Sequence, residues 1–115
     1  PGQIQGDGEQ SRDFTFISDC LQATIKAMTA ELAPGNVYNV ACGRQATVNE
    51  LYRIICRILD VNLEPEHKTE REGDVRHSLA DIESTVSDLD YRPEYSLEQG
   101  LKASLPWYVE QCSRV

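Results

Sequence analysis

Apolar residues recur every three or four positions in several stretches of the chain, which predicts amphipathic helices. In the first stretch, Ser18 or Asp19 is a candidate N-cap, and Pro34-Gly35 ends the pattern. The stripe of this predicted helix consists of Leu21, Ile25, Met28 and Leu32. We expect the stripe to lie in the core, with the helix packed on a sheet.

Thr47 and Glu50 are spaced as in a capping box, which predicts the start of a second helix. Its predicted buried stripe is Val48, Leu51, Ile55, Ile58 and Leu59. A third helix is predicted over 82–89, capped by Asp81 and ended by the Asp90-Tyr91-Arg92-Pro93 segment.

The last predicted helix begins at Ser96, with Gln99 as its capping partner. Leu97, Leu101, Leu105 and Tyr108 form its apolar face. Pro106 lies inside this pattern, and we expect a kink or a break there because proline has no N–H to donate.

Short runs of β-branched and aromatic residues predict strands between these helices. The clearest are residues 14–17 and 37–40; residues 62–68 have the character of an edge strand, and 75–79 also alternate. Helices mixed with a few short strands predict an α/β (mixed α+β) fold, in one domain over residues 1–115.

The composition narrows the classes of partner. Eleven basic and 19 acidic residues give a net charge of −8, so a nucleic acid or an anionic membrane would bind against the field of the protein. No apolar run approaches a membrane span, and we expect a cytoplasmic protein. The chain opens at Pro1, within a loop-like segment, and we expect it to be a fragment of a longer protein.

The cysteines are widely spaced and form no C-x-x-C pair; they are Cys20, Cys42, Cys56 and Cys112. Two disulfides could be formed from four cysteines, but we favour free, buried thiols in a reducing compartment. With two histidines in the chain, no metal-ligand spacing is present, and we predict no metal site.

Residues 70–81 form the stretch with the clearest candidate chemistry. Arg71 offers a planar fork of donors that suits phosphate oxygens, Gly73 permits a tight turn, and Asp74 can accept from vicinal hydroxyls. The same residues would also suit a solvated charged turn without a function. Residue types alone leave both interpretations open.

The motifs along the chain resemble one family. They are G-D-G-E-Q-S-R-D-F at 6–14, V-Y-N-V at 37–40, T-V-N-E-L at 47–51, R-E-G-D-V-R-H-S-L-A-D-I at 71–82 and Y-R-P at 91–93. Together they resemble the C-terminal, substrate-binding portion of the Rossmann-type extended short-chain dehydrogenases that act as NAD-dependent nucleotide-sugar epimerases. Within that family, the chain looks most like bacterial UDP-N-acetylglucosamine 4-epimerases of surface-polysaccharide biosynthesis, on the basis of Val40-Ala41 and Pro106-Trp107-Tyr108.

The resemblance implies roles for four residues. Arg12 and Arg71 would hold the diphosphate of a UDP-sugar, Asp74 would bind the ribose hydroxyls, and Phe14 would lie beside the nucleotide. Arg76 and His77 also match the motif, but we interpret them as structural, or as residues that support the ligand-binding side chains without touching the ligand. In the intact family enzyme a tyrosine base and bound NAD oxidise the sugar at C4 and reduce it on its other face.

Two parts of the family enzyme have no counterpart in this chain. The glycine fingerprint of the dinucleotide-binding domain is absent, and none of the five tyrosines is followed by lysine four positions later. We therefore predict no catalytic residue, no NAD bound by this chain and no epimerase activity of the chain alone. The expected partners are a UDP-sugar and a missing N-terminal NAD-binding domain, and exposed apolar helix faces could also drive self-association.

Other functions remain open at this point. The chain could be a non-catalytic nucleotide-sugar-binding or interaction module that exists alone. It could also be the same part of a 4,6-dehydratase or a decarboxylase, which the catalytic residues of the missing portion would distinguish.

Overall fold

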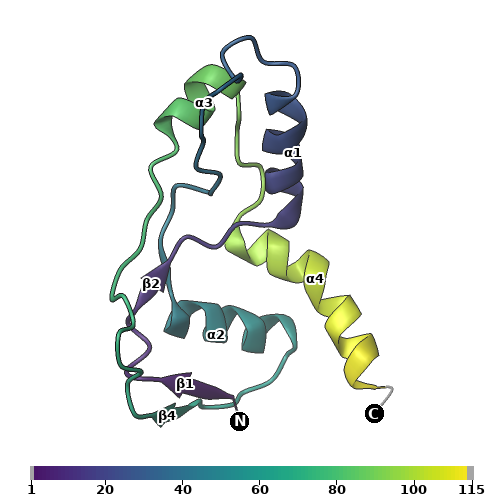
Figure 1. Ribbon diagram of the computed structural model, residues 1–115. Helices are drawn as coiled ribbons and strands as arrows, with labels where there is room; N and C mark the ends of the chain where they lie inside the picture. The colour runs from purple at the N-terminus through teal and green to yellow at the C-terminus, as the bar shows by residue number, and fades with distance from the viewer. Residues whose placement is uncertain (1, 114–115) are drawn as a thin grey trace. The chain divides into compact units, whose positions relative to one another are not determined.

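A computed structural model describes residues 2–113 of the chain, with four α-helices and four short β-strands (Figure 1). This mixture confirms the predicted α/β (mixed α+β) class. The stretch predicted as one domain, residues 1–115, groups into two compact units. Unit 1 comprises Pro1–Phe14 and Arg44–Leu79, and unit 2 comprises Thr15–Gly43 and Ala80–Val115.

Unit 1 contains two small sheets. Strand β1 (Gln3–Gln5) pairs in parallel with β4 (Glu66–Lys68), which confirms the last three residues of the strand predicted over 62–68. Strand β2 (Ser11–Arg12) pairs antiparallel with β3 (Ala46–Thr47). The strand predicted over 75–79 is wrong, because this stretch contributes a single bridge, between His77 and Ser11.

Helix α2 (Val48–Ile58) follows β3 directly in unit 1. Its predicted capping box is confirmed: the Glu50 backbone N–H donates to Thr47 Oγ1 at 3.0 Å, and the Thr47 N–H donates to Glu50 Oε2 at 2.8 Å. These two bonds satisfy backbone donors that have no partner within the helix.

Helix α1 (Ile17–Ala27) in unit 2 begins where the sequence predicts a strand, so the strand over 14–17 is wrong. Phe16 is the N-cap and makes no side-chain capping bond, so Ser18 and Asp19 are not the cap either. The buried Asp19 carboxylate instead accepts from the backbone N–H groups of Glu94 and Tyr95, at 2.9 and 3.2 Å. Hydrogen bonds from backbone N–H groups to a charged carboxylate are strong. This contact therefore ties the start of α1 to the segment before the last helix.

The stripe predicted for the first helix is exposed, contrary to the prediction that it lies in the core. The helix also ends at Ala27, before the predicted end at Pro34-Gly35, so Met28 and Leu32 lie beyond α1. Leu21, Ile25, Met28 and Leu32 are between 54% and 80% exposed. The core of unit 2 is instead built on Ala23, Leu89 and Tyr91. The Tyr91 hydroxyl donates to the carbonyl of Ala41 at 2.9 Å, which satisfies the polar end of a fully buried ring.

Residues 37–40 do not form the predicted strand. Among residues 2–113 no strand pairs with this segment, and Val37 is 94% exposed. β-branched residues favour an extended backbone, but a strand also requires a neighbouring strand to complete its hydrogen bonds.

Two further helices belong to unit 2. Helix α3 (Glu83–Leu89) begins one residue later than predicted, because Ile82 and not Asp81 is its N-cap. Asp81 Oδ1 nevertheless accepts from the Glu83 N–H at 3.0 Å. Asp90, which follows the helix, lies in the left-handed region (φ 51°). Helix α4 (Leu97–Cys112) has the predicted capping box of Ser96 and Gln99.

The helical face predicted for α4 is only partly covered. Leu97, Leu101 and Leu105 are half-buried, whereas Tyr108 is exposed. The helix continues through Pro106, so the predicted break is wrong. The carbonyl of the exposed Lys102, which loses its partner at Pro106, can be hydrated there.

All four cysteines are free thiols; Cys112 is exposed and the other three are half-buried rather than buried. Within the described residues, no helix combines the length and the apolar character that crossing a membrane requires.

Candidate functional site

The two residues of β2 lie between segments from two other parts of unit 1. On one side Ser11 pairs with Thr47. On the other side the Ser11 N–H donates to the Arg76 carbonyl at 2.9 Å, and the Ser78 N–H donates to the Ser11 carbonyl at 3.1 Å. The next side chain along the strand, Arg12, is therefore held at the edge of the segment that carries the 71–82 motif.

Arg12 and Asp74, two of the four predicted site residues, are in direct contact. The Arg12 Nη2 atom lies 2.5 Å from Asp74 Oδ1, although the residues are 62 positions apart in the sequence. Arg12 Nη1 also donates to the carbonyl of Ser11 at 2.8 Å. Both side chains of the ion pair remain 31% exposed, so the pair is accessible to a ligand.

Arg71, the third predicted site residue, lies in the same turn as Asp74. The Asp74 N–H donates to the Arg71 carbonyl at 3.2 Å, which closes a four-residue turn. Gly73 has φ 80° in this turn, a conformation that favours glycine. Arg71 and Asp74 are therefore the first and last residues of one turn, whose Asp74 side chain contacts Arg12.

Phe14, the fourth predicted site residue, is half-buried and follows Arg12 by two positions at the end of the first segment of unit 1. The roles assigned to these four residues, two arginines on a diphosphate, a carboxylate on ribose and an aromatic ring beside the nucleotide, stay predictions.

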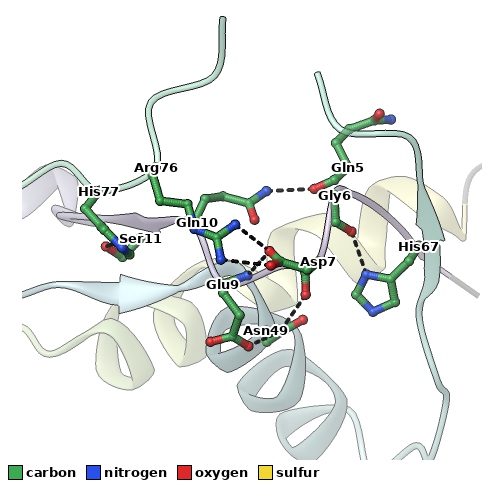
Figure 2. A network of polar contacts seen from close by, with 10 residues as sticks. All are labelled: Gln5, Gly6, Asp7, Glu9, Gln10, Ser11, Asn49, His67, Arg76 and His77. Atoms are coloured by element: carbon green, nitrogen blue, oxygen red, sulfur yellow. Dashed lines mark hydrogen bonds and ion pairs between the residues drawn. The ribbon is translucent and has the colours of Figure 1, made fainter. Parts of the chain in front are cut away.

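A second ion pair in unit 1 joins Asp7 to Arg76. Figure 2 shows the guanidinium of Arg76 placed as a fork on the carboxylate of Asp7, with both Nη atoms 2.8 Å from the two oxygens. The Glu9 backbone N–H donates to Asp7 Oδ1 at 2.9 Å. The bonds from Arg76, and then that from Glu9, lower the pKa of Asp7 from 3.8 to about 2. The same pairing raises the pKa of Arg76.

Asn49 at the start of α2 holds the turn that carries Asp7. Its Nδ2 donates to the Asp7 carbonyl at 2.9 Å and to Glu9 Oε1 at 2.6 Å. A bond of 2.8 Å joins Ser11 Oγ to His77 Nδ1 near the same turn. The turn is therefore tied both to α2 and to the motif segment.

The partners in this network are not visible in the sequence. Arg76 and His77 were interpreted as structural, and their contacts with Asp7 and Ser11 agree with that interpretation. Asp7 belongs to the G-D-G-E-Q-S-R-D-F motif, which gives it no role of its own. An acidic residue in a turn and an arginine 69 positions later carry no pairing signal, because surface charges of both signs are common.

The unit contains two hollows that none of the four predicted site residues lines. One, of about 480 Å³, is lined by Glu9, Ser11, Gln45, Ala46, Thr47, Glu50, Arg76 and His77. The other, of about 380 Å³, lies between α2 and residues 61–67. The Arg12–Asp74 pair is thus an exposed edge, as expected for one wall of a site whose other walls come from elsewhere.

The sequence of residues 2–104 matches the family described as GDP-mannose 4,6 dehydratase. The chain belongs to this family of NAD-dependent nucleotide-sugar epimerases and dehydratases. The family is that of the extended short-chain dehydrogenases, as the resemblance of the motifs had indicated.

Solved structures of family members have the same fold as this chain. The UDP-glucose 4-epimerase of Thermotoga maritima, with UDP-glucose, has a TM-score of 0.89 and 34% identity over 96% of this chain. The UDP-N-acetylglucosamine 4-epimerase of Methanobrevibacter ruminantium, in complex with UDP-N-acetylmuramic acid, has a TM-score of 0.87 and 35% identity over 96% of this chain. The UDP-glucuronic acid 4-epimerase of Bacillus cereus, in complex with UDP-glucuronic acid and NAD, has a TM-score of 0.86 and 31% identity over the same share.

The chain covers only 35% of each of these three structures, and about a third of the length of the curated relatives that it matches. It thus corresponds to a portion of the Rossmann-type enzyme, in agreement with the predicted C-terminal portion.

Proposed function

We propose that this chain is the UDP-sugar-binding part of a longer NAD-dependent nucleotide-sugar 4-epimerase, and that it is inactive alone. The observation that carries the proposal is the contact of Arg12 with Asp74 in unit 1, in a turn whose first residue is Arg71. Two guanidinium groups and one carboxylate are the groups that a nucleoside diphosphate requires. The guanidiniums match its phosphates, and the carboxylate matches its ribose hydroxyls.

The ion pair prepares Arg12 for this role. Its guanidinium already donates to Asp74 and to the carbonyl of Ser11, which restricts a flexible side chain to one orientation. A preorganised arginine loses less conformational freedom when phosphate arrives. Asp74 has a second carboxylate oxygen for a ribose hydroxyl, so in this proposal both residues bind substrate while they remain in contact.

Anchoring the UDP moiety is the mechanistic contribution that we assign to the chain. Binding energy from the nucleotide, remote from the reacting carbon, sets the position of the sugar and leaves the sugar ring free to turn over. The chain supplies no proton or hydride step, because it lacks the tyrosine-lysine pair of the family.

The residues of the chain do not fit NAD. The dinucleotide site of this fold rests on a glycine-rich turn between a strand and a helix, and the seven glycines have no such spacing. NAD, which is present in the B. cereus relative, would belong to the part of the family enzyme outside this chain.

Exposed apolar surface on unit 2 supports the proposal that a further part of the enzyme packs against this chain. Ile17, Leu21 and Ile25 on α1, and Met28 directly after it, follow one another at helical spacing, and all are more than half exposed. Apolar side chains gathered on one helix face usually contact another element in a complete fold. We assign this face to the NAD-binding part of the intact enzyme.

The substrate is proposed to be a UDP-sugar of the N-acetylglucosamine or glucose type. The M. ruminantium and T. maritima epimerases, which are 35% and 34% identical to this chain, support this choice.

The test uses the longer polypeptide encoded by a reading frame continuous with this chain. With UDP-N-acetylglucosamine or UDP-glucose as substrate, we expect 4-epimerase activity with NAD. Arg71→Ala should weaken UDP-sugar binding by about 1.5–3 kcal/mol, or roughly 10- to 150-fold. Arg53→Ala, at an exposed position on α2, is the matched control.

Two results would contradict the proposal. One is an unchanged Michaelis constant for Arg71→Ala. The other is a coding sequence that starts independently at this chain, which would instead support a nucleotide-sugar-binding module that acts alone.

A further inference from the structure

The segment 71–79, which we call the strap, carries two of the proposed ligand residues, and every one of its residues is exposed. It therefore has no buried side chain to hold it in place. Polar contacts join it to the segment 7–12 of unit 1. They are the two backbone bonds at Ser11, the Ser11–His77 bond, and the ion pairs Arg12–Asp74 and Asp7–Arg76.

The two ion pairs have opposite polarity. In one, the strap supplies the carboxylate (Asp74) and the segment 7–12 supplies the guanidinium (Arg12); in the other, the strap supplies the guanidinium (Arg76) and the segment supplies the carboxylate (Asp7). Sliding the strap so that Arg76 takes the place of Asp74 would bring Arg76 towards Arg12 and leave Asp7 without its partner. Like charges opposite each other are unfavourable, so the two pairs together specify one register.

Asp7 is the more firmly held of the two carboxylates. Its turn contains Gly6 and Gly8, with φ of 72° and 77°, and Asn49 donates to its carbonyl. The Glu9 N–H donates to Asp7 Oδ1, the oxygen that also accepts from Arg76 Nη1. Figure 2 shows these contacts gathered around Asp7, with Arg76 reaching them from the strap. The turn therefore offers a fixed anchor, onto which Arg76 docks as a two-pronged fork.

We propose that Asp7 and Arg76 are positioning residues of the nucleotide-sugar site: their ion pair holds the strap in the register that places Asp74 on Arg12 and Arg71 beside them. The expected effect on substrate binding rests on the proposed function. The placement of the strap is a property of the unliganded chain. Neither residue needs to touch the substrate.

The pair acts on local rather than global stability. Both side chains are about half exposed, and exposed ion pairs add little to the free energy of unfolding. A segment without apolar burial opens locally at low free-energy cost, so a single polar anchor can control its opening. Loss of the pair should free the strap while the helices of the chain stay folded.

The first experiment compares amide hydrogen exchange in the wild-type 115-residue chain with Asp7→Asn and Arg76→Lys. The reporters are the N–H groups of Ser11 and Ser78. The Ser11 N–H donates to a carbonyl in the strap, and the Ser78 N–H, in the strap, donates to the carbonyl of Ser11. We expect exchange at both reporters to be at least tenfold faster in Asp7→Asn, with amides of α1 and α2 unchanged. Arg76→Lys keeps the charge but loses the fork, so its effect should be intermediate.

A matched control tests whether loss of any exposed ion pair has this effect. Arg92→Gln removes an exposed pair with Asp90, in unit 2, and should leave both reporters unchanged. Equal exchange at Ser11 and Ser78 in wild type and Asp7→Asn would overturn the proposal. Equal acceleration in Arg92→Gln and Asp7→Asn would overturn it as well.

The second experiment links the strap to the ligand. In NMR titrations with millimolar UDP, the chemical-shift changes that UDP causes at Arg12 and Asp74 should be at least fivefold smaller in Asp7→Asn than in the wild type. In Arg92→Gln these changes should equal those of the wild type. Unchanged shifts in Asp7→Asn would overturn the positioning role. If UDP shifts no signal of Arg12, Arg71 or Asp74 in the wild-type 115-residue chain, Asp7→Asn is tested in the longer polypeptide, where an unchanged Michaelis constant for the UDP-sugar would overturn the positioning role. The proposed function is tested separately by Arg71→Ala, and the exchange rates decide whether Asp7 and Arg76 hold the strap.

Discussion

Replacing Gly8 by alanine should destabilise unit 1, because the turn that carries Asp7 has no room for a Cβ atom. A Cβ built at Gly8 lies 2.1 Å from Asn49 Oδ1 and 2.9 Å from Asn49 Nδ2. Gly8 also has φ 77°, where alanine is unfavourable. The substitution therefore combines a backbone cost with the displacement of Asn49.

The magnitude follows from these two contributions. Placing an alanine in the left-handed region costs about 1–2 kcal/mol. Asn49 can move away only by giving up its bonds to the Asp7 carbonyl and to Glu9, each of which contributes about 0.5–1.5 kcal/mol. Together we expect Gly8→Ala to lower the free energy of unfolding by about 2–5 kcal/mol.

Gly35→Ala and Gly73→Ala are matched controls for the backbone cost. Both glycines have φ 80°, and a Cβ at either position meets no atom within 4 Å. Each should cost about 1–2 kcal/mol. Urea unfolding followed by circular dichroism would measure all three variants. A Gly8→Ala chain as stable as the Gly35→Ala chain would refute the argument that Asn49 occupies the space above Gly8.

Three further predictions concern turnover by the chain, the pKa of Asp7 and self-association. The purified 115-residue protein should show no turnover of UDP-glucose or UDP-N-acetylglucosamine with NAD added, and measurable turnover would refute the assignment of catalysis to the rest of the enzyme. The contacts of Arg76 and Glu9 with Asp7 should be fully present above pH 3.8 and lost as the pH falls through about 2, because they lower the pKa of Asp7. NMR titration of the Asp7 carboxyl carbon should show a midpoint near 2 that returns towards 3.8 in Arg76→Gln; a midpoint near 3.8 in the wild type would contradict the paired geometry. Sedimentation should show that the wild-type chain self-associates as its concentration rises. The double variant Leu21→Glu, Ile25→Glu on α1 should associate less. Equal association of the wild type and the double variant would place the contact elsewhere.

Features that depend on residues close together in the sequence were predicted well. The capping boxes of α2 and α4 each involve a side chain and a backbone group three positions apart, and both form as predicted. The bond from the Glu83 N–H to Asp81 Oδ1 is equally local, although Ile82 and not the predicted Asp81 is the N-cap of α3. Such contacts form within one turn of helix, so the sequence contains all of their parts.

The predictions that were wrong depended on what each segment packs against. Residues 37–40 are β-prone, but no strand of the described chain pairs with them. The stripe on α1 has helical spacing, but periodicity specifies which residues share a face and not what covers that face. A chain that spans about a third of its relatives leaves such faces and edges without partners.

The site shows the same division between local signals and long-range pairing. The sequence by itself determined the family, the turn around Gly73 and the residue types suited to a nucleoside diphosphate. Only the tertiary structure decided that Arg12 meets Asp74 and that Asp7 anchors Arg76, across 62 and 69 positions of sequence. The physical reason is that one carboxylate can pair with any arginine that the fold brings near it, and that choice depends on the path of the whole chain.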